Sequence, residues 1–167
     1  MTSDAQDRVW AEVEPQLHRI AVAKLASEQN CSLAPGDLVN DAVARILDYA
    51  GYECERSLQI IAQASHVMRQ VLVDHARKKL TEKRRHEQVT LVTAIAEDPP
   101  IDLIELDLLM EELGQIDPER VRLVEMRFFG GMTIEEIAEA TGSSPATVKR
   151  RWTATRAWLY HRLSTRP

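Results

Sequence analysis

The sequence has few of the residues that stabilise small secreted proteins or large β-sandwiches. It contains two cysteines in 167 residues, Cys31 and Cys54, and aromatic residues make up 5% of the chain. The cysteines form no CxxC pair and have no histidine at zinc spacing, so we expect two reduced thiols and no metal site. The scarcity of aromatic side chains favours small helical cores.

Signals for secretion and membrane insertion are also missing. The first ten residues, MTSDAQDRVW, do not place a basic start ahead of an apolar run, which is the pattern of a secretory signal. No uninterrupted apolar stretch approaches the roughly 18–20 residues that a membrane span requires. We therefore expect a cytoplasmic protein that does not insert into a membrane.

Motifs of enzymes are absent as well. The chain has no GxxxxGK[ST], HExxH or GxSxG pattern, and no His/Cys cluster at metal-ligand spacing. The sequence therefore predicts a protein that is not an enzyme and that needs no cofactor.

Two stretches of the chain each carry charges of only one sign, and the formal net charge of the whole chain is −5. Residues 97–119 carry nine acidic groups and no basic one, whereas residues 143–167 carry six basic groups and no acidic one. Residues 66–96 form a second basic region with a net charge of +4. One basic region alone is as well explained by a solvated face, but two of them indicate two contacts with a polyanion.

Helical spacing of apolar residues dominates the chain, and no segment alternates as a strand does. The first half predicts three helices, within residues 10–26, 31–50 and 57–85, with Pro15 as an irregularity in the first. The third helix has one apolar side and a basic second half. That side comprises Leu58, Ile61, Ala62, Ser65, Met68, Leu72 and Ala76.

Pro99-Pro100 cannot lie inside a helix, and we place an inter-domain linker at residues 86–101. The predicted fold class is therefore all-α, with two small helical domains, residues 1–85 and 102–167, joined by a flexible acidic linker. The second domain should begin with an acidic helix that ends at Gly114.

The segment MTIEEIAEATGSSPATVKRRW predicts a helix-turn-helix. Thr133 and Glu136 have the spacing of a capping box, Gly142 ends the first helix, and Ser144 with Pro145 starts the second. The second helix should bury Val148, Trp152, Thr155 and Leu159. Such a second helix enters the DNA major groove, although an ordinary helical hairpin with a basic surface is the alternative.

The opposite face of this second helix carries the predicted contacts to duplex DNA. Lys149 and Arg150 can donate paired hydrogen bonds to guanine, whereas Arg151, Arg156 and Arg162 are better suited to phosphates. The predicted set is Ser144, Ala146, Thr147, Lys149, Arg150, Arg151, Thr153 and Arg156.

Three stretches together resemble a family. DLVNDAVARIL, MRQVLVDHARKK and LVEMRFFGGMTIEEIAEATGSSPATVKRRWTATRAWLYHRL look like bacterial RNA polymerase sigma factors of the extracytoplasmic-function (ECF) group, over residues 14–163. The resemblance implies that the first domain binds core RNA polymerase and melts the −10 promoter element. It implies that the helix-turn-helix recognises the −35 element as duplex.

The resemblance also implies roles for single residues in the first domain. The exposed contacts to core polymerase would be Asp37, Asn40, Asp41 and Arg45. The contacts to the −10 element would be Arg69, Gln70, Arg77 and Lys78, while His66 is more simply a helix-surface residue. The chain lacks the aromatics usual at the start of the melting helix, so Tyr52 either holds an extruded base or packs in the core.

Several alternatives stay open at this point. The acidic stretch 97–119 either keeps the protein soluble, folds back on the basic surfaces of the free protein, or enters the RNA exit path of polymerase. A stand-alone dimeric helix-turn-helix regulator is an alternative function, and a protein-binding adaptor is another. An anti-sigma factor and a kinase are both open as regulatory partners.

Overall fold

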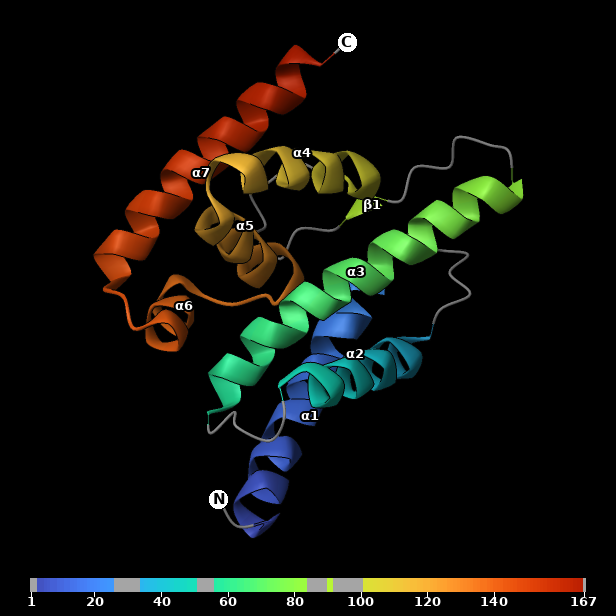
Figure 1. Cartoon of the computed structure of the whole chain (residues 1–167), viewed down its shortest axis with the longest axis vertical. Helices are drawn as coiled ribbons and strands as arrows, with labels where there is room; N and C mark the ends of the chain where they lie inside the picture. Colours follow the sequence, from blue (N-terminus) through green and yellow to red (C-terminus); the bar gives the residue numbers. More distant parts are fainter. Residues whose placement is uncertain (1–2, 26–33, 51–55, 84–89, 92–100, 167) are drawn as a thin grey trace.

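The computed structural model describes residues 3–25, 34–50, 56–83, 90–91 and 101–166. These residues form an all-α fold, as predicted, with one π-helical segment and one pair of two-residue strands (Figure 1). The elements in chain order are α1 (Ser3–Leu25), α2 (Pro35–Ala50), α3 (Ser57–Lys83), β1 (Thr90–Leu91), β2 (Ile101–Asp102), α4 (Leu103–Ile116), α5 (Pro118–Val124), η1 (Glu125–Phe129), α6 (Ile134–Thr141) and α7 (Pro145–Thr165).

Helix α3 is the central element of the fold. It packs against α1 and α2 on one side and against α4, η1 and α6 on the other, and Figure 1 shows it passing between these two groups. The predicted apolar side is buried or half-buried, and a second set is buried with it: Ile60, Ala64, Val67, Val71 and Val73. A helix that is apolar on more than one side must be covered on more than one side.

Helices α1 and α2 cover the first side of α3. Val13, Leu17 and Leu38 are among their buried side chains. The predicted irregularity at Pro15 does not interrupt α1, which continues through it with the proline ring on the exposed surface. The burial therefore follows the predicted stripe while the backbone is more regular than expected.

Strands β1 and β2 were not predicted from the sequence. They pair antiparallel, with Thr90 opposite Asp102 and Leu91 opposite Ile101. Asp102 then caps α4, because its carboxylate accepts a 2.9 Å hydrogen bond from the backbone N–H of Glu105. Most of the predicted linker, residues 86–101, lies outside the described residues.

Helices α4 and α5 meet at a turn that differs slightly from the prediction. Helix α4 does not end at Gly114 but continues to Ile116, and the backbone N–H of Asp117 closes it on the carbonyl of Leu113. A Cβ atom at Gly114 would lie 3.6 Å from Val121 Cγ2, which is an ordinary van der Waals distance, so close packing of the two helices does not require glycine here. Asp117 and Pro118 start α5 as predicted.

Two further kinds of feature are missing from the described part of the chain. No helix there is both long and apolar enough to cross a membrane. No group of three His, Cys, Asp or Glu side chains in those segments could hold a metal ion.

Candidate nucleic-acid interface

Helices α6 and α7 are joined by a tight turn whose caps are those predicted from the sequence. Thr133 and Glu136 form a reciprocal capping box. Gly142 ends α6 in the left-handed conformation, with φ of 67°, which glycine adopts without strain. Ser144 then caps α7, accepting a 3.2 Å hydrogen bond from the backbone N–H of Thr147. The turn therefore fixes where α7 begins.

One face of α7 is apolar and packs against neighbouring elements, including η1. Val148, Trp152, Thr155 and Leu159 are all buried, as predicted. The rings of Trp152 and Phe128 meet edge to face at 5.6 Å, and the Arg127 guanidinium lies 5.2 Å from the centre of the Trp152 ring. These contacts set the orientation of the opposite face of α7.

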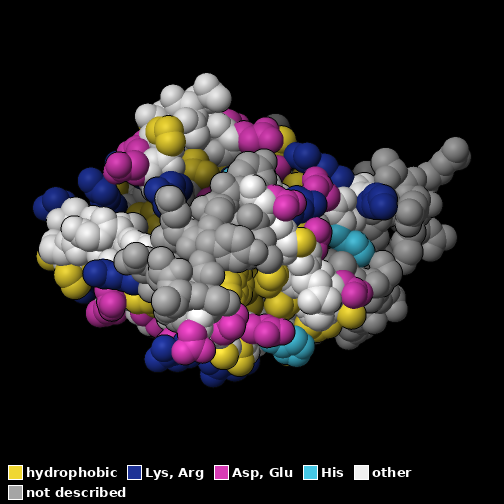
Figure 2. Space-filling view, turned by 60° about the horizontal axis from the view of Figure 1, so that its bottom comes forward, with side chains coloured by type: hydrophobic (Ala, Val, Ile, Leu, Met, Phe, Trp, Pro, Cys, Tyr) yellow, Lys and Arg dark blue, Asp and Glu magenta, His cyan; other side chains and the backbone are white. Residues whose placement is uncertain are grey.

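That opposite face is exposed and basic. Ala146, Lys149, Arg150 and Thr153 all lie on it. Within the described residues, the side chains of Lys149 and Arg150 make no ion pair or hydrogen bond. Figure 2 shows Lys and Arg side chains at several places on the surface, with Asp and Glu side chains between them. These two cations are therefore available to a polyanion.

The other arginines of α7 are held by groups of the same chain. Arg151 pairs with Glu119 at 3.3 Å, and Arg156 lies over the ring of Tyr160. Arg162 and Arg166 both bind the Glu112 carboxylate, and the hydrogen bond from Arg162 lowers the pKa of Glu112. Arg151 and Arg162, which are predicted to contact phosphates, must therefore leave a carboxylate of the same chain before they can bind DNA. Lys149 and Arg150 have no such partner among the described residues.

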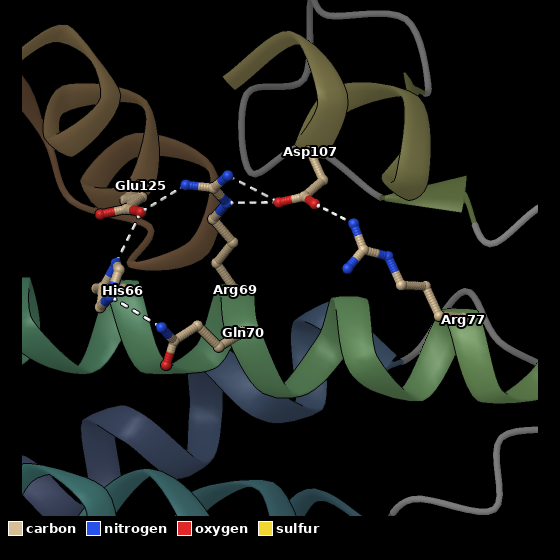
Figure 3. Close-up of polar contacts among 6 residues, drawn as sticks. All are labelled: His66, Arg69, Gln70, Arg77, Asp107 and Glu125. Carbon is tan, nitrogen blue, oxygen red and sulfur yellow. Dashed lines mark hydrogen bonds and ion pairs between the residues drawn. The ribbon is translucent and has the colours of Figure 1, made fainter. Parts of the chain in front are cut away.

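A second cluster of charges lies where α3 faces α4 and η1 (Figure 3). The guanidinium of Arg69 donates to Asp107 Oδ1 at 2.9 Å through Nε and to Glu125 Oε1 at 2.9 Å through Nη1. Arg77 donates to the other oxygen of Asp107 at 3.0 Å. The side chains of Arg69, Asp107 and Glu125 are only 12%, 8% and 5% exposed, so solvent screens this network little.

His66 and Gln70 extend the network along α3. The ring of His66 donates from Nδ1 to Glu125 Oε1 at 2.9 Å, and its Nε2 lies 3.1 Å from the Gln70 side-chain nitrogen. The hydrogen bond to Glu125 raises the pKa of His66 above its ordinary value of 6.5, although burial and Arg69 act in the opposite direction. His66 thus lies on the surface of α3, as expected from the sequence, and its ring also binds a buried carboxylate.

This raised pKa predicts a pH dependence of stability. The folded protein holds the His66 proton more tightly than the unfolded chain, so the stabilisation is complete below pH 6.5 and is lost as the pH rises through the raised pKa. We expect the free energy of unfolding of the native protein to exceed that of His66→Gln by more at pH 6 than at pH 8. The change should be under about 1 kcal/mol, because half of the ring is exposed to solvent. Urea unfolding of both proteins at both pH values measures it, and a difference that stays constant or grows towards pH 8 contradicts it.

A comparison with models of known protein families gives one match. The model of the ECF sigma factors matches residues 2–165 of the chain. The chain belongs to this family. A search of curated proteins and a search of solved structures each returned no match.

ECF sigma factors are transcription initiation factors without enzymatic activity, and they act with core RNA polymerase on promoter DNA. The chain is therefore a sigma factor with a role in transcription initiation. No catalytic centre is needed to explain its charged clusters.

The residues predicted to touch core polymerase lie on α2 of this sigma factor. Asp37 and Asn40 are exposed, and Arg45 pairs with Asp41 one helical turn earlier at 3.5 Å. Arg45 also lines a cavity that Arg69, Gln70, Arg77 and Asp107 share. The α2 and α3 sets thus approach each other in space.

The remaining predicted residues divide into exposed and covered ones. Lys78 and Arg77 are exposed on α3, Gln70 is exposed beside His66, and Arg69 is covered. Tyr52 lies outside the described residues. Three of the four α3 residues assigned to the −10 element are therefore exposed, and Arg69 is covered by groups of the same chain.

Sequence analysis missed the two carboxylates that cover Arg69. Asp107 lies in α4 next to the buried Leu106, and Glu125 lies between the buried Val124 and Met126. Charged residues are seldom fully buried unless they are paired. An acid at an inward position of an apolar helix was the available signal, and it pointed to a buried cationic partner.

Proposed function

We propose that this sigma factor directs core RNA polymerase to promoters in which α7 reads a −35 element as duplex and α3 acts on a −10 element in the bacterial cytoplasm. The observation that carries the proposal is the pair of exposed cations, Lys149 and Arg150, near the start of α7, which make no ion pair with the residues that the structure describes. Side chains in the first turns of such a helix are those that reach base edges in the major groove.

Core polymerase is the partner that we assign to α2. The exposed Asp37 and Asn40, together with the Asp41–Arg45 pair, offer charged and polar groups on one helix. The promoter contacts assigned to α3 are Arg69, Gln70, Arg77 and Lys78, and Tyr52 belongs to the same proposal as the residue that holds an extruded base. In this scheme residues 1–85 and 102–167 act as two separate units joined by residues 86–101.

Run-off transcription with purified bacterial core polymerase tests the proposal. The template is the fragment upstream of the gene for this protein, and gel filtration tests whether the protein elutes with core. Co-elution and a defined start site are expected. Failure to associate with core, with tight binding to a palindrome instead, would favour a dimeric helix-turn-helix regulator. Failure to bind either core or DNA would favour an adaptor.

Removing either Lys149 or Arg150 should weaken promoter recognition. A good paired contact to a base contributes about 1–3 kcal/mol of discrimination, so Lys149→Ala and Arg150→Ala should each reduce run-off transcription about 5- to 150-fold at subsaturating factor. Arg8→Ala, which removes an exposed arginine of α1 that pairs with Asp4, is the control and should be unchanged.

Band-shift titration of the holoenzyme on templates with a mutated −35 element completes this test. The native holoenzyme should lose affinity for such a template, and the Lys149 and Arg150 variants should lose much less. Equal losses in all three proteins would show that α7 does not read this element.

A further inference from the structure

A cavity of about 360 Å³ lies where α1, the start of α3 and the turn before α6 meet. Helices α1 and α6 both pack on α3, and Figure 1 shows them near its first half. Sites for small ligands have volumes of about 300–1,000 Å³. We propose that this cavity binds a small amphiphile, a molecule with an apolar body and one anionic head, such as a medium-chain carboxylate.

The inner side of the cavity is apolar. Ile61 of α3 and Met132 from the turn before α6 are 3% and 2% exposed. Ile20 and Leu58 line the cavity as well, and both are partly buried against the core. Apolar surface of this kind binds hydrocarbon, because both partners remove apolar area from water. The apolar body of the ligand therefore lies against these four side chains.

The turn between η1 and α6 gives the cavity a fixed wall. Gly131 has a φ of 59°, and Arg127 Nη1 donates a 2.6 Å hydrogen bond to the carbonyl of Met132. A Cβ atom at Gly130 would lie 2.1 Å from Ser65 Oγ, so glycine lets this turn pack directly on α3. The wall is thus formed in the absence of a ligand, as the walls of small-molecule sites usually are.

The charged groups of the cavity favour an anionic head. Among the described residues, the charged side chains that line it are Arg19 and Glu136. The Glu136 carboxylate is already engaged, because it accepts a 2.7 Å hydrogen bond from the backbone N–H of Thr133 in the capping box. Arg19 is exposed and makes no ion pair or hydrogen bond with any residue that the structure describes. The charge that remains for a ligand is therefore positive.

Gln16 adds a neutral donor beside Arg19. The two residues are three positions apart on α1, so they lie on the same side of the helix, and both line the cavity. A guanidinium presents paired donors that match a carboxylate, and a side-chain amide donates to the same group. Polar donors thus lie on the exposed side of the cavity and apolar surface on the buried side, which is the order of groups in an amphiphile.

Calorimetric titration of the full-length free protein with decanoate tests the inference. Decanoate should bind saturably at one site. Decyltrimethylammonium, with the same chain length and a cationic head, should bind at least about tenfold more weakly, because it loses the charged hydrogen bonds to Arg19. Acetate, which has the head and no apolar body, should not bind. No saturable binding of decanoate, or binding of the cation that is equal or tighter, would refute the inference.

Two variants of α1 locate the site. Arg19→Gln should weaken decanoate binding at least about tenfold, whereas Arg8→Gln, at an exposed arginine that pairs with Asp4, should not. Ala23→Glu places a carboxylate beside the ligand head and one helical turn from Arg19, so it should abolish binding. Ala11→Glu adds the same charge at an exposed position of α1 away from the cavity and should bind decanoate like the native protein.

Thermal unfolding gives a second readout in the same proteins. A ligand that binds the folded state alone raises the unfolding temperature, so decanoate should raise it in the native protein and in both controls but not in Arg19→Gln or Ala23→Glu. Arg19 and Ala23 are exposed, and circular dichroism verifies that both variants fold. Native affinity in either variant, or an equal loss in its control, would refute the site. Neither DNA nor polymerase is present, so the outcome is independent of the promoter contacts assigned above.

Discussion

Replacement of Trp152 by alanine is expected to lower the free energy of unfolding by about 3–5 kcal/mol, the usual cost of emptying a large aromatic site in a core. Trp152 is 8% exposed, meets Phe128 edge to face and lies under the guanidinium of Arg127. Both contacts join α7 to η1. Their loss should release α7 and with it the proposed recognition of the −35 element.

Chemical denaturation followed by circular dichroism measures this loss, and run-off transcription measures its consequence. Trp158→Ala is the matched control, because Trp158 is on the same helix but only partly buried. It should cost clearly less than Trp152→Ala. A Trp152→Ala protein that is destabilised by less than 1 kcal/mol would show that this contact does not hold α7 in place.

Replacement of Arg69 by methionine should destabilise the free protein by about 3 kcal/mol. Removing one partner of a buried ion pair typically costs 3–5 kcal/mol, because the remaining charge is left without compensation. Here the lower end applies, since Arg77 still binds Asp107 and His66 still binds Glu125. The buried network therefore makes the free protein sensitive to a residue that sequence analysis assigns to DNA.

A double-mutant cycle measures this coupling. Asp107→Asn should lower the free energy of unfolding by less in the Arg69→Met background than in the native protein. In that background the Asp107 carboxylate has already lost its ion pair with residue 69, so its removal breaks one interaction fewer. Arg151→Met is the control, since Arg151 and Glu119 are 50% and 75% exposed and such pairs contribute at most about 1 kcal/mol. Additive effects of the Arg69 and Asp107 substitutions would contradict a coupled buried pair.

Much of the C-terminal half could be predicted from the sequence because local rules determine it. The capping box at Thr133, the left-handed Gly142 and the cap at Ser144 each depend on residues within one helical turn. The buried face of α7 follows from helical spacing alone. Local signals of this kind do not depend on what the rest of the chain does.

The role of α3 could not be predicted in the same way, because it depends on contacts between distant parts of the chain. Periodicity showed one apolar side, but Ile60, Val67 and Val71 are buried as well. Arg69 was expected to contact DNA because the sequence around it resembles the −10 helix of the family. Its partners are 38 and 56 residues away in sequence, and no local pattern relates residues at such a separation.

The central claim is that the face of α3 that carries Gln70 meets promoter DNA in the polymerase complex. Crosslinking from a photoreactive side chain at Gln70, which is exposed beside His66, tests it most directly. We predict crosslinks to the −10 region of the promoter in the holoenzyme complex. Crosslinks confined to the same chain in an actively transcribing complex would contradict the claim.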